Sequence, residues 1–119
     1  MNREIKFRGK HLNKWIYGYL LKNIDDNKYY ISVNLDQFYQ VKEETIGQYT
    51  GLKDKNGVEI YEGDIVKYEG EDTSYVVMFD PTGYWCLDGN GARNSEMLYY
   101  EDIFKYLEII GNIYENEVD

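Results

Sequence analysis

The chain has 119 residues and a formal net charge of −9, and aromatic residues make up 17% of it. This length fits one compact domain with a single hydrophobic core. No stretch approaches the roughly 20 consecutive apolar residues that cross a bilayer, and the start lacks the apolar segment of a signal peptide, so we expect a cytoplasmic protein. Because the sequence has a single cysteine, Cys86, it cannot form an internal disulfide or a cysteine-rich zinc site.

The first part of the chain predicts three strands. Residues 3–8 alternate apolar and charged side chains, which indicates a strand with one face in water. Residues 15–21 are apolar on both faces, so we expect a strand covered on two sides, with Gly18 at a bulge or a close backbone approach. Residues 29–33 predict the third strand, and the weakly periodic residues 34–44 predict an irregular connector.

Turn signals dominate the centre of the sequence. Asn56 and Gly57 are residue types that tolerate the positive φ required in a two-residue hairpin loop. Gly63 then leads into an apolar run that begins at Asp64, which is typical of a chain leaving a turn to form a strand. From here on, strands are expected at residues 45–49, 64–69, 75–79, 84–87 and 107–114.

The last third of the chain mixes loops with one helical signal. Residues 80–83 predict a proline-containing turn, and the glycine-rich residues 88–91 predict a loop. Residues 95–105 are compatible with one or two helical turns capped by Asn94 or Ser95. Gly111 is expected at a bulge in the final strand.

Together these elements predict an all-β fold, mainly β with one short helical turn. We expect a single domain over residues 1–119. Residues 45–114 would form a small SH3-like barrel, residues 1–44 an N-terminal β extension with a connector, and residues 115–119 a charged tail.

Four segments, taken in order, resemble the YopX family of phage and prophage proteins. The resemblance implies a protein encoded by a phage or prophage of a bacterium, an SH3-like β-barrel and no established biochemical activity, and it supplies no catalytic residues. The chain departs from the family pattern at residues 117–119, where relatives tend to continue with proline and leucine. The segments are Arg-Glu-Ile-Lys-Phe-Arg at 3–8, Thr-Ile-Gly-Gln-Tyr-Thr-Gly-Leu-Lys-Asp-Lys-Asn-Gly at 45–57, Ile-Tyr-Glu-Gly-Asp-Ile-Val at 60–66 and Ile-Gly-Asn-Ile-Tyr-Glu-Asn at 110–116.

The sequence holds no motif that identifies an enzyme. His11 lies in a polar turn, and no spacing ties it to Cys86 or to a serine as the base of a nucleophile. Residues 54–57 and 88–91 lack the glycine and glutamate positions of a calcium loop, and no glycine-rich phosphate loop occurs. We therefore expect no catalytic residue, no bound metal and no cofactor. A metal-assisted hydrolase remains an alternative that would draw its carboxylates from Glu59, Glu62, Asp64 and Asp80.

Aromatic side chains are frequent anchors of protein-binding surfaces, which favours a non-catalytic interaction module. We expect its partner to be a host or phage protein. A second hypothesis is that the acidic part of the chain mimics DNA and inhibits a host DNA-binding enzyme. The expected binding residues, around the predicted barrel loops, are Tyr49, Tyr61, Asp64, Tyr68, Tyr84 and Trp85.

Charge is distributed unevenly along the chain. Residues 1–42 hold eight Lys/Arg against four Asp/Glu, a net of +4, whereas residues 43–119 hold five against eighteen, a net of −13. An acidic surface repels phosphate backbones, so we do not expect nucleic-acid binding. The asymmetry also permits a homo-oligomer. Binding to nucleic acid would depend on the basic arm, which is Arg3, Lys6, Arg8, Lys10 and Lys14.

Overall fold

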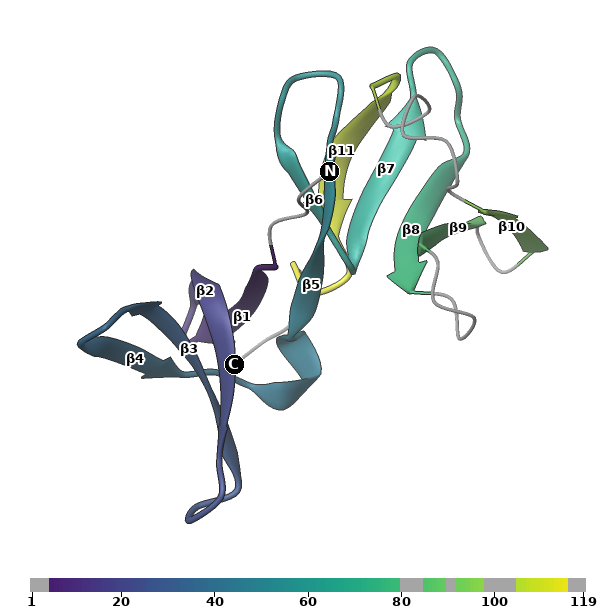
Figure 1. The fold of residues 1–119 in the computed structure, drawn as a ribbon. Coiled ribbons are helices and arrows are strands. Elements are labelled where there is room, and N and C mark those ends of the chain that lie inside the picture. The colour runs from purple at the N-terminus through teal and green to yellow at the C-terminus, as the bar shows by residue number, and fades with distance from the viewer. Residues whose placement is uncertain (1–4, 80–84, 90–91, 98–104, 116–119) are drawn as a thin grey trace. The chain divides into compact units, whose positions relative to one another are not determined.

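The computed structural model describes residues 5–79, 85–89, 92–97 and 105–115 (Figure 1). These residues fold almost entirely into antiparallel strands, which confirms the all-β prediction. No closed barrel is found among them, so the SH3-like closure is not confirmed. The described residues divide into two compact units, the first ending at Tyr49 and the second beginning at Thr50.

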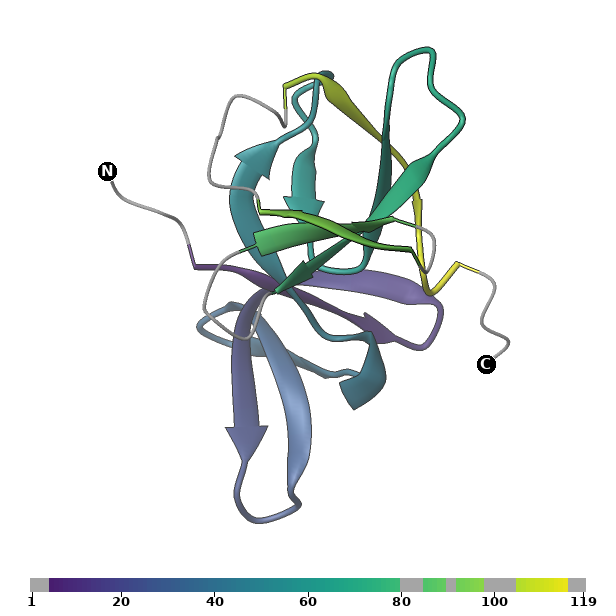
Figure 2. The ribbon, with the colours of Figure 1, turned by 90° about the vertical axis from the view of Figure 1, so that its right-hand side faces the viewer.

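The first unit is an antiparallel sheet with the strand order β4-β3-β2-β1, and the beginning of β5 pairs with β1. Strand β2 is long enough to serve two neighbours: Gly18 pairs with Phe7 of β1, and Tyr19 pairs with Ser32 of β3. Figure 2 shows the resulting β2–β3 hairpin. The elements are β1 (Phe7–His11), β2 (Lys14–Asn23), β3 (Lys28–Asn34), β4 (Gln37–Gln40), the 3-10 turn η1 (Glu43–Thr45) and β5 (Gly47–Lys53).

Two predictions for this region need correction. Strand β1 lies at Phe7–His11 instead of residues 3–8, of which residues 3 and 4 lie outside the described part. The expected connector contains β4 and η1. Strand β4 lacks a periodic pattern of its own, and it forms because β3 offers it a partner edge.

Gly18 lies where β2 passes from one neighbour to the other. A Cβ atom at this position would lie 2.1 Å from the Ser32 carbonyl oxygen, a distance that no side chain tolerates. The expected close backbone approach is therefore confirmed, and it explains why glycine occupies the middle of an otherwise bulky strand.

The core of the first unit lies on one face of its sheet. The pairing registers place Leu20, Ile31 and Tyr39 on this face, and Ile31 is fully buried. After β4 the chain crosses the same face, so that Val41 packs directly against Gly9. On the opposite face, β2 leaves large side chains exposed in the described part of the chain, whereas Arg8 and Lys10 of β1 are buried.

The second unit contains the end of β5, strand β6 and a five-stranded sheet with the order β10-β9-β8-β7-β11. Its core consists of Ile60, Val66, Val77 and Leu107, all fully buried. These side chains come from four different strands, so the core depends on contacts between distant parts of the sequence. The strands are β6 (Glu59–Tyr61), β7 (Asp64–Tyr68), β8 (Ser74–Phe79), β9 (Trp85–Gly89), β10 (Ala92–Met97) and β11 (Leu107–Asn112).

The loop between β5 and β6 is organised by a buried carboxylate. Asp54 Oδ1 accepts the backbone N–H groups of Asn56 (2.8 Å) and Val58 (2.9 Å), and Oδ2 accepts the N–H of Ile109 (3.1 Å). The loop is thus longer than the two-residue loop expected. Gly57 has a φ of +81°, so it adopts the left-handed conformation that its residue type favours.

Predictions for the end of the chain have mixed outcomes. Gly111 follows a register shift between β11 and β7, which confirms the bulge. Strand β9 extends through Gly89, so the prediction of a loop over residues 88–91 is wrong for residues 88 and 89. Strand β10 includes residues 95–97, so the prediction of helical turns over residues 95–105 is wrong for these three residues. Residues 98–104 and the predicted turn at residues 80–83 lie outside the described part.

Candidate functional site

Three of the six expected binding residues are buried in the structure. Tyr49 and Tyr61 are almost without exposed surface, and so is Asp64. Asp64 Oδ2 accepts the backbone N–H of Tyr61 at 2.7 Å, and the Tyr61 hydroxyl donates to Glu59 Oε1 at 3.1 Å. These contacts hold the turn between β6 and β7. In this structure, Tyr61 and Asp64 therefore stabilise the fold.

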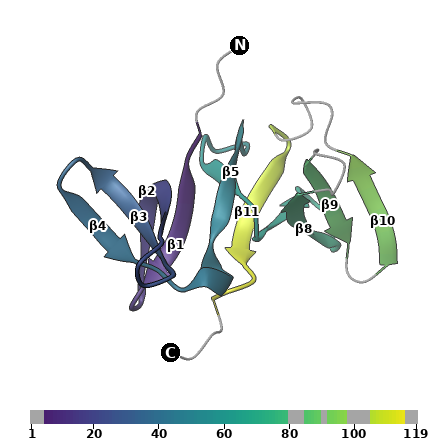
Figure 3. The same cartoon turned by 60° about the horizontal axis from the view of Figure 1, so that its bottom comes forward.

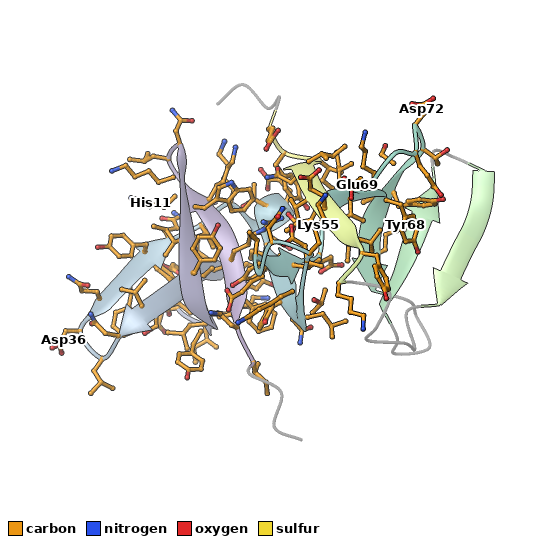
Figure 4. The ribbon with its side chains drawn as sticks, turned by 90° about the horizontal axis from the view of Figure 1, so that it is seen from above. His11, Asp36, Lys55, Tyr68, Glu69 and Asp72 are labelled. Atoms are coloured by element: carbon orange, nitrogen blue, oxygen red, sulfur yellow. The ribbon has the colours of Figure 1, made fainter. Side chains whose placement is uncertain are left out.

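The other expected binding residues are less enclosed. Tyr68 is half-buried, and its ring meets that of Tyr75 edge-on with the centroids 6.3 Å apart (Figure 4). Tyr84 and the side chain of Trp85 lie outside the described residues. The binding role of this set stays a prediction.

The sequence predicts that Lys6 and Arg8 lie on a strand face in water, and this is wrong for Arg8. Arg8 and Lys10 are buried, and both lie over the ring of Trp15, at 4.5 and 5.5 Å from its centroid. Lys6 lies 5.5 Å from the centroid of the Tyr49 ring. Cations stacked on aromatic faces stabilise a fold when they are desolvated, so these residues contribute to packing. Lys14 is exposed at the start of β2, and Arg3 lies outside the described residues.

Strand β2 carries the clearest candidate for a binding surface. The prediction that it is covered on both faces is wrong, because Tyr17 (45%), Tyr19 (67%) and Leu21 (41%) are exposed on one face. Large apolar side chains on an open sheet face cost solvation free energy and are frequent at interaction sites. The sequence signal for this stripe is the run of bulky residues at alternate positions. The residue types alone do not show whether anything covers them.

The exposed stripe of β2 continues across the neighbouring strands. Leu21 pairs with Tyr30 of β3, and Ser32 of β3 pairs with Phe38 of β4, which is 52% exposed. A hollow of about 490 Å³ opens here, and we call it the first hollow. It is lined by Leu21, Lys22, Asn23, Tyr30 and Phe38.

A polar contact lies at the side of the first hollow. The Tyr30 hydroxyl donates to Asp26 Oδ2 at 2.5 Å. This bond lowers the pKa of Asp26, with a smaller contribution from the backbone N–H of Lys28, and it raises the pKa of Tyr30. Asp26 is exposed and Tyr30 is half-buried at the surface, so the bond fixes the orientation of the Tyr30 ring and adds little stability.

A second hollow of about 490 Å³ lies next to the β1–β2 turn, on the opposite face of the sheet. Leu12 in this turn has a φ of +56°, which is unfavourable for a bulky residue. His11 Nδ1 donates to the carbonyl of Gln40 at 2.8 Å, and its ring meets Tyr39 at 5.4 Å, so the histidine joins β1 to β4. The lining residues are His11, Leu12, Asn13, Lys14, Ile16 and Tyr39.

Within the described residues no three His, Cys, Asp or Glu side chains come close enough together to hold a metal ion. In the same part of the chain, no helix has the length and apolar character needed to cross a membrane. Glu59 and Asp64, two of the carboxylates considered for metal chemistry, both bond to Tyr61. Asp80 lies outside the described part.

Comparison with known protein families gives a match. A family model described as YopX protein matches residues 6–118, a range that includes both units. No curated protein matches the chain. The match thus covers nearly the whole chain, and the binding surfaces must be argued from the structure.

Proposed function

The chain belongs to the YopX family, and we propose that it is a non-catalytic module that binds another protein through its first unit. The binding surface is the exposed stripe on β2 together with Phe38 of β4 and the first hollow. Surface rings that remain half exposed beside an open hollow have the composition and shape of an interface centre.

The observation that carries this proposal is the distribution of exposed apolar side chains. In the described part of the chain they are more numerous in the first unit, where they occupy strand faces as well as turns. A single exposed apolar residue needs no explanation, but a contiguous stripe does. Those of the first unit are Ile5, Leu12, Tyr17, Tyr19, Leu21, Ile24, Val33, Leu35 and Phe38, and those of the second are Val58, Met78, Tyr106, Ile110 and Ile113.

Site-specific photo-crosslinking tests the proposal. A photoreactive phenylalanine analogue replaces Tyr19 in one protein and Tyr106 in another, since the two side chains are similarly exposed at 67% and 60%. In bacteria that naturally encode the chain, we expect a discrete adduct from position 19 and none from position 106. Equal adducts from both positions, or none from position 19, would contradict the proposal.

The charge of the second unit favours a second candidate function. Residues 50–117 hold five Lys/Arg against fifteen Asp/Glu, a net of −10, and the exposed Glu69 and Asp72 lie at the β7–β8 turn (Figure 4). Such a surface is suited to occupy a DNA-binding groove in place of a phosphate backbone. A bacterial restriction enzyme whose binding to labelled DNA is displaced by the chain at low salt supports this function, and unaffected DNA binding refutes it.

A further inference from the structure

In the described part of the chain, β4 is the last strand of its sheet and pairs with β3 alone (Figure 3), and His11 bonds one carbonyl on its outer side. The Val41 N–H donates to the Tyr29 carbonyl at 3.0 Å, so hydrogen-bonded pairs with β3 fall on Val41 and, two residues earlier, on Tyr39. The backbone groups of Phe38 and Gln40 therefore point away from β3. The bond from His11 to the Gln40 carbonyl agrees with this direction.

Most edge strands in natural proteins carry a feature that prevents further pairing, such as a lysine, a proline or an inward-pointing charge. Strand β4, Gln37 to Gln40, contains none of these residues, although it is short and its pairing with β3 shifts register between Ser32 and Asn34. Its edge offers the N–H and C=O of Phe38 and the N–H of Gln40 to an incoming chain. An extended peptide can join a sheet in this way, with main-chain hydrogen bonds giving affinity and side-chain pockets giving specificity.

The two hollows lie on opposite faces of the sheet, and each has one residue of β4 in its lining. Phe38 lines the first hollow and Tyr39, its neighbour in sequence, lines the second. Successive side chains of a strand point to opposite faces, so two adjacent residues of an added strand would lie beside Phe38 on one face and beside Tyr39 on the other. The linings therefore select a peptide with two consecutive apolar residues.

The charges around the hollows select the residues on either side of that apolar pair. Each lining contains one exposed lysine, Lys22 in the first hollow and Lys14 in the second, and neither lining contains a carboxylate. Asp26 bonds to Tyr30 at the side of the first hollow, and Lys28 offsets its charge. Acidic side chains next to the apolar pair would complement the two lysines.

We infer that β4 binds an extended acidic segment of the partner protein as an additional antiparallel or parallel strand, with two consecutive apolar residues packed beside Phe38 and Tyr39. This inference rests on the proposed function and specifies the partner's chemistry. The bound segment would extend the β4-β3-β2-β1 sheet by one strand, and its acidic residues would lie near Lys14 and Lys22.

Synthetic peptides with capped ends test the inference on the full chain. The acidic probe is Asp-Glu-Ile-Phe-Glu-Asp, and the matched basic probe is Lys-Arg-Ile-Phe-Arg-Lys. We expect the acidic peptide to bind about tenfold more tightly at low salt, a difference of about 1.4 kcal/mol, and to slow amide hydrogen exchange at Phe38 and Gln40. Equal binding of the two peptides would overturn the inference.

Two matched variants examine the edge itself. Gln40→Pro removes a backbone N–H that points away from β3, whereas Gln40→Ala removes the same side chain and keeps the N–H. We expect Gln40→Pro to lose about tenfold in affinity for the acidic peptide and Gln40→Ala to bind as the native chain does. Similar binding by both variants would refute strand addition.

A modified peptide keeps the test valid if Gln40→Pro does not fold. In an extended peptide, alternate N–H groups point to opposite edges. One modified probe is methylated at the nitrogens of one edge, and the other is methylated at the nitrogens of the opposite edge, so each lacks the N–H donors of one edge. We expect one of the two to lose binding to the native chain, and full binding by both contradicts the inference.

The crosslinking experiment separates the inference from the proposed function. If Gln40→Pro folds and still forms the adduct from position 19, the partner binds without strand pairing, so the inference fails and the proposed function stands. A different outcome is that neither peptide binds but the native chain self-associates and Gln40→Pro does not. In that case β4 would pair with a second copy of this chain, and the inferred partner segment would be wrong.

Discussion

The two units differ in where they place their apolar side chains. In the second unit, Ile60, Val66, Val77 and Leu107 are fully buried together. In the first unit, Ile31 is fully buried, but Tyr19 and Phe38 remain largely exposed on the other side of the sheet. Burial of apolar area is the main favourable term in folding, so these four side chains of the core stabilise the second unit together. The first unit leaves comparable side chains available for binding.

Charge follows the same division. Residues 1–49 hold eight Lys/Arg against six Asp/Glu, a net of +2, while residues 50–117 have a net of −10. The acidic residues therefore belong mainly to the unit with the larger core, and the apolar surface belongs to the unit of weakly basic character. A partner that is acidic and apolar would be attracted to the first unit and repelled by the second.

The largest predicted effect separates a core leucine from a surface leucine. We expect Leu107→Ala to lower the free energy of unfolding by about 2–5 kcal/mol, because it removes a fully buried side chain and leaves a cavity. Leu21→Ala, on the exposed stripe, should cost less than about 1 kcal/mol. Urea denaturation followed by circular dichroism measures both. Equal losses would show that the two units do not differ as described.

The next effect concerns how the second unit joins distant segments. Asp54 accepts three backbone N–H groups, one of them from Ile109 in β11. We expect Asp54→Ala to lower the free energy of unfolding by about 1–3 kcal/mol, because it leaves donors without their acceptor. The control is Asp36→Ala in the exposed β3–β4 turn of the first unit, which should change stability by less than about 0.5 kcal/mol. A loss at Asp54 no greater than that at Asp36 would contradict the structural role.

Local chemistry explains which parts of the fold were predictable from sequence. Gly18, Gly57 and Gly111 were informative because a close approach, a positive φ and a bulge each favour glycine. Strands β4 and β10 were missed because their stability comes from pairing with β3 and β9, and short polar segments show no period of their own.

The candidate site was harder to predict because exposure is a property of the whole fold. Tyr19 and Tyr61 are the same residue type in apolar surroundings, yet Tyr19 is exposed and Tyr61 is buried. The sequence identifies Tyr17, Tyr19 and Leu21 as one face of a strand, but not whether another element covers that face. Charge was equally misleading at Arg8, which packs on Trp15 instead of lying in water.

A smaller effect, and one of opposite sign, is expected at a turn of the first unit. Leu12 has a φ of +56°, a conformation that costs a residue with a side chain about 1–2 kcal/mol. We expect Leu12→Gly to raise the free energy of unfolding by about 0.5–1 kcal/mol, since glycine removes the steric cost but adds entropy to the unfolded chain. Leu35→Gly is the control, because Leu35 is also exposed in a hairpin turn and has no positive φ. Stabilisation by both variants, or by neither, would argue against backbone strain at Leu12.

The smallest effect tests whether the polar contact beside the first hollow is a surface interaction. The Tyr30 hydroxyl is the main cause of the lowered pKa of Asp26, and the same bond raises the pKa of Tyr30. A lowered carboxyl pKa contributes stability above its unfolded value of about 3.9, and this is lost as pH falls through the folded value. A raised tyrosine pKa contributes below its unfolded value of about 10, and this is lost as pH rises through the folded value.

The bond therefore stabilises the hairpin only between these two limits, and its position at the surface keeps its contribution small. In an NMR titration of the Asp26 carboxyl carbon, we expect Tyr30→Phe to raise the pKa of Asp26 towards its ordinary value. Tyr29→Phe, on the neighbouring residue, should leave the pKa of Asp26 unchanged. If Tyr30→Phe also leaves it unchanged, the hydroxyl does not hold the carboxylate, and the ring of Tyr30 is free to turn out of the first hollow. The binding surface would then form only when a partner arrives, and the contrast between a preformed core in the second unit and a preformed surface in the first would no longer hold.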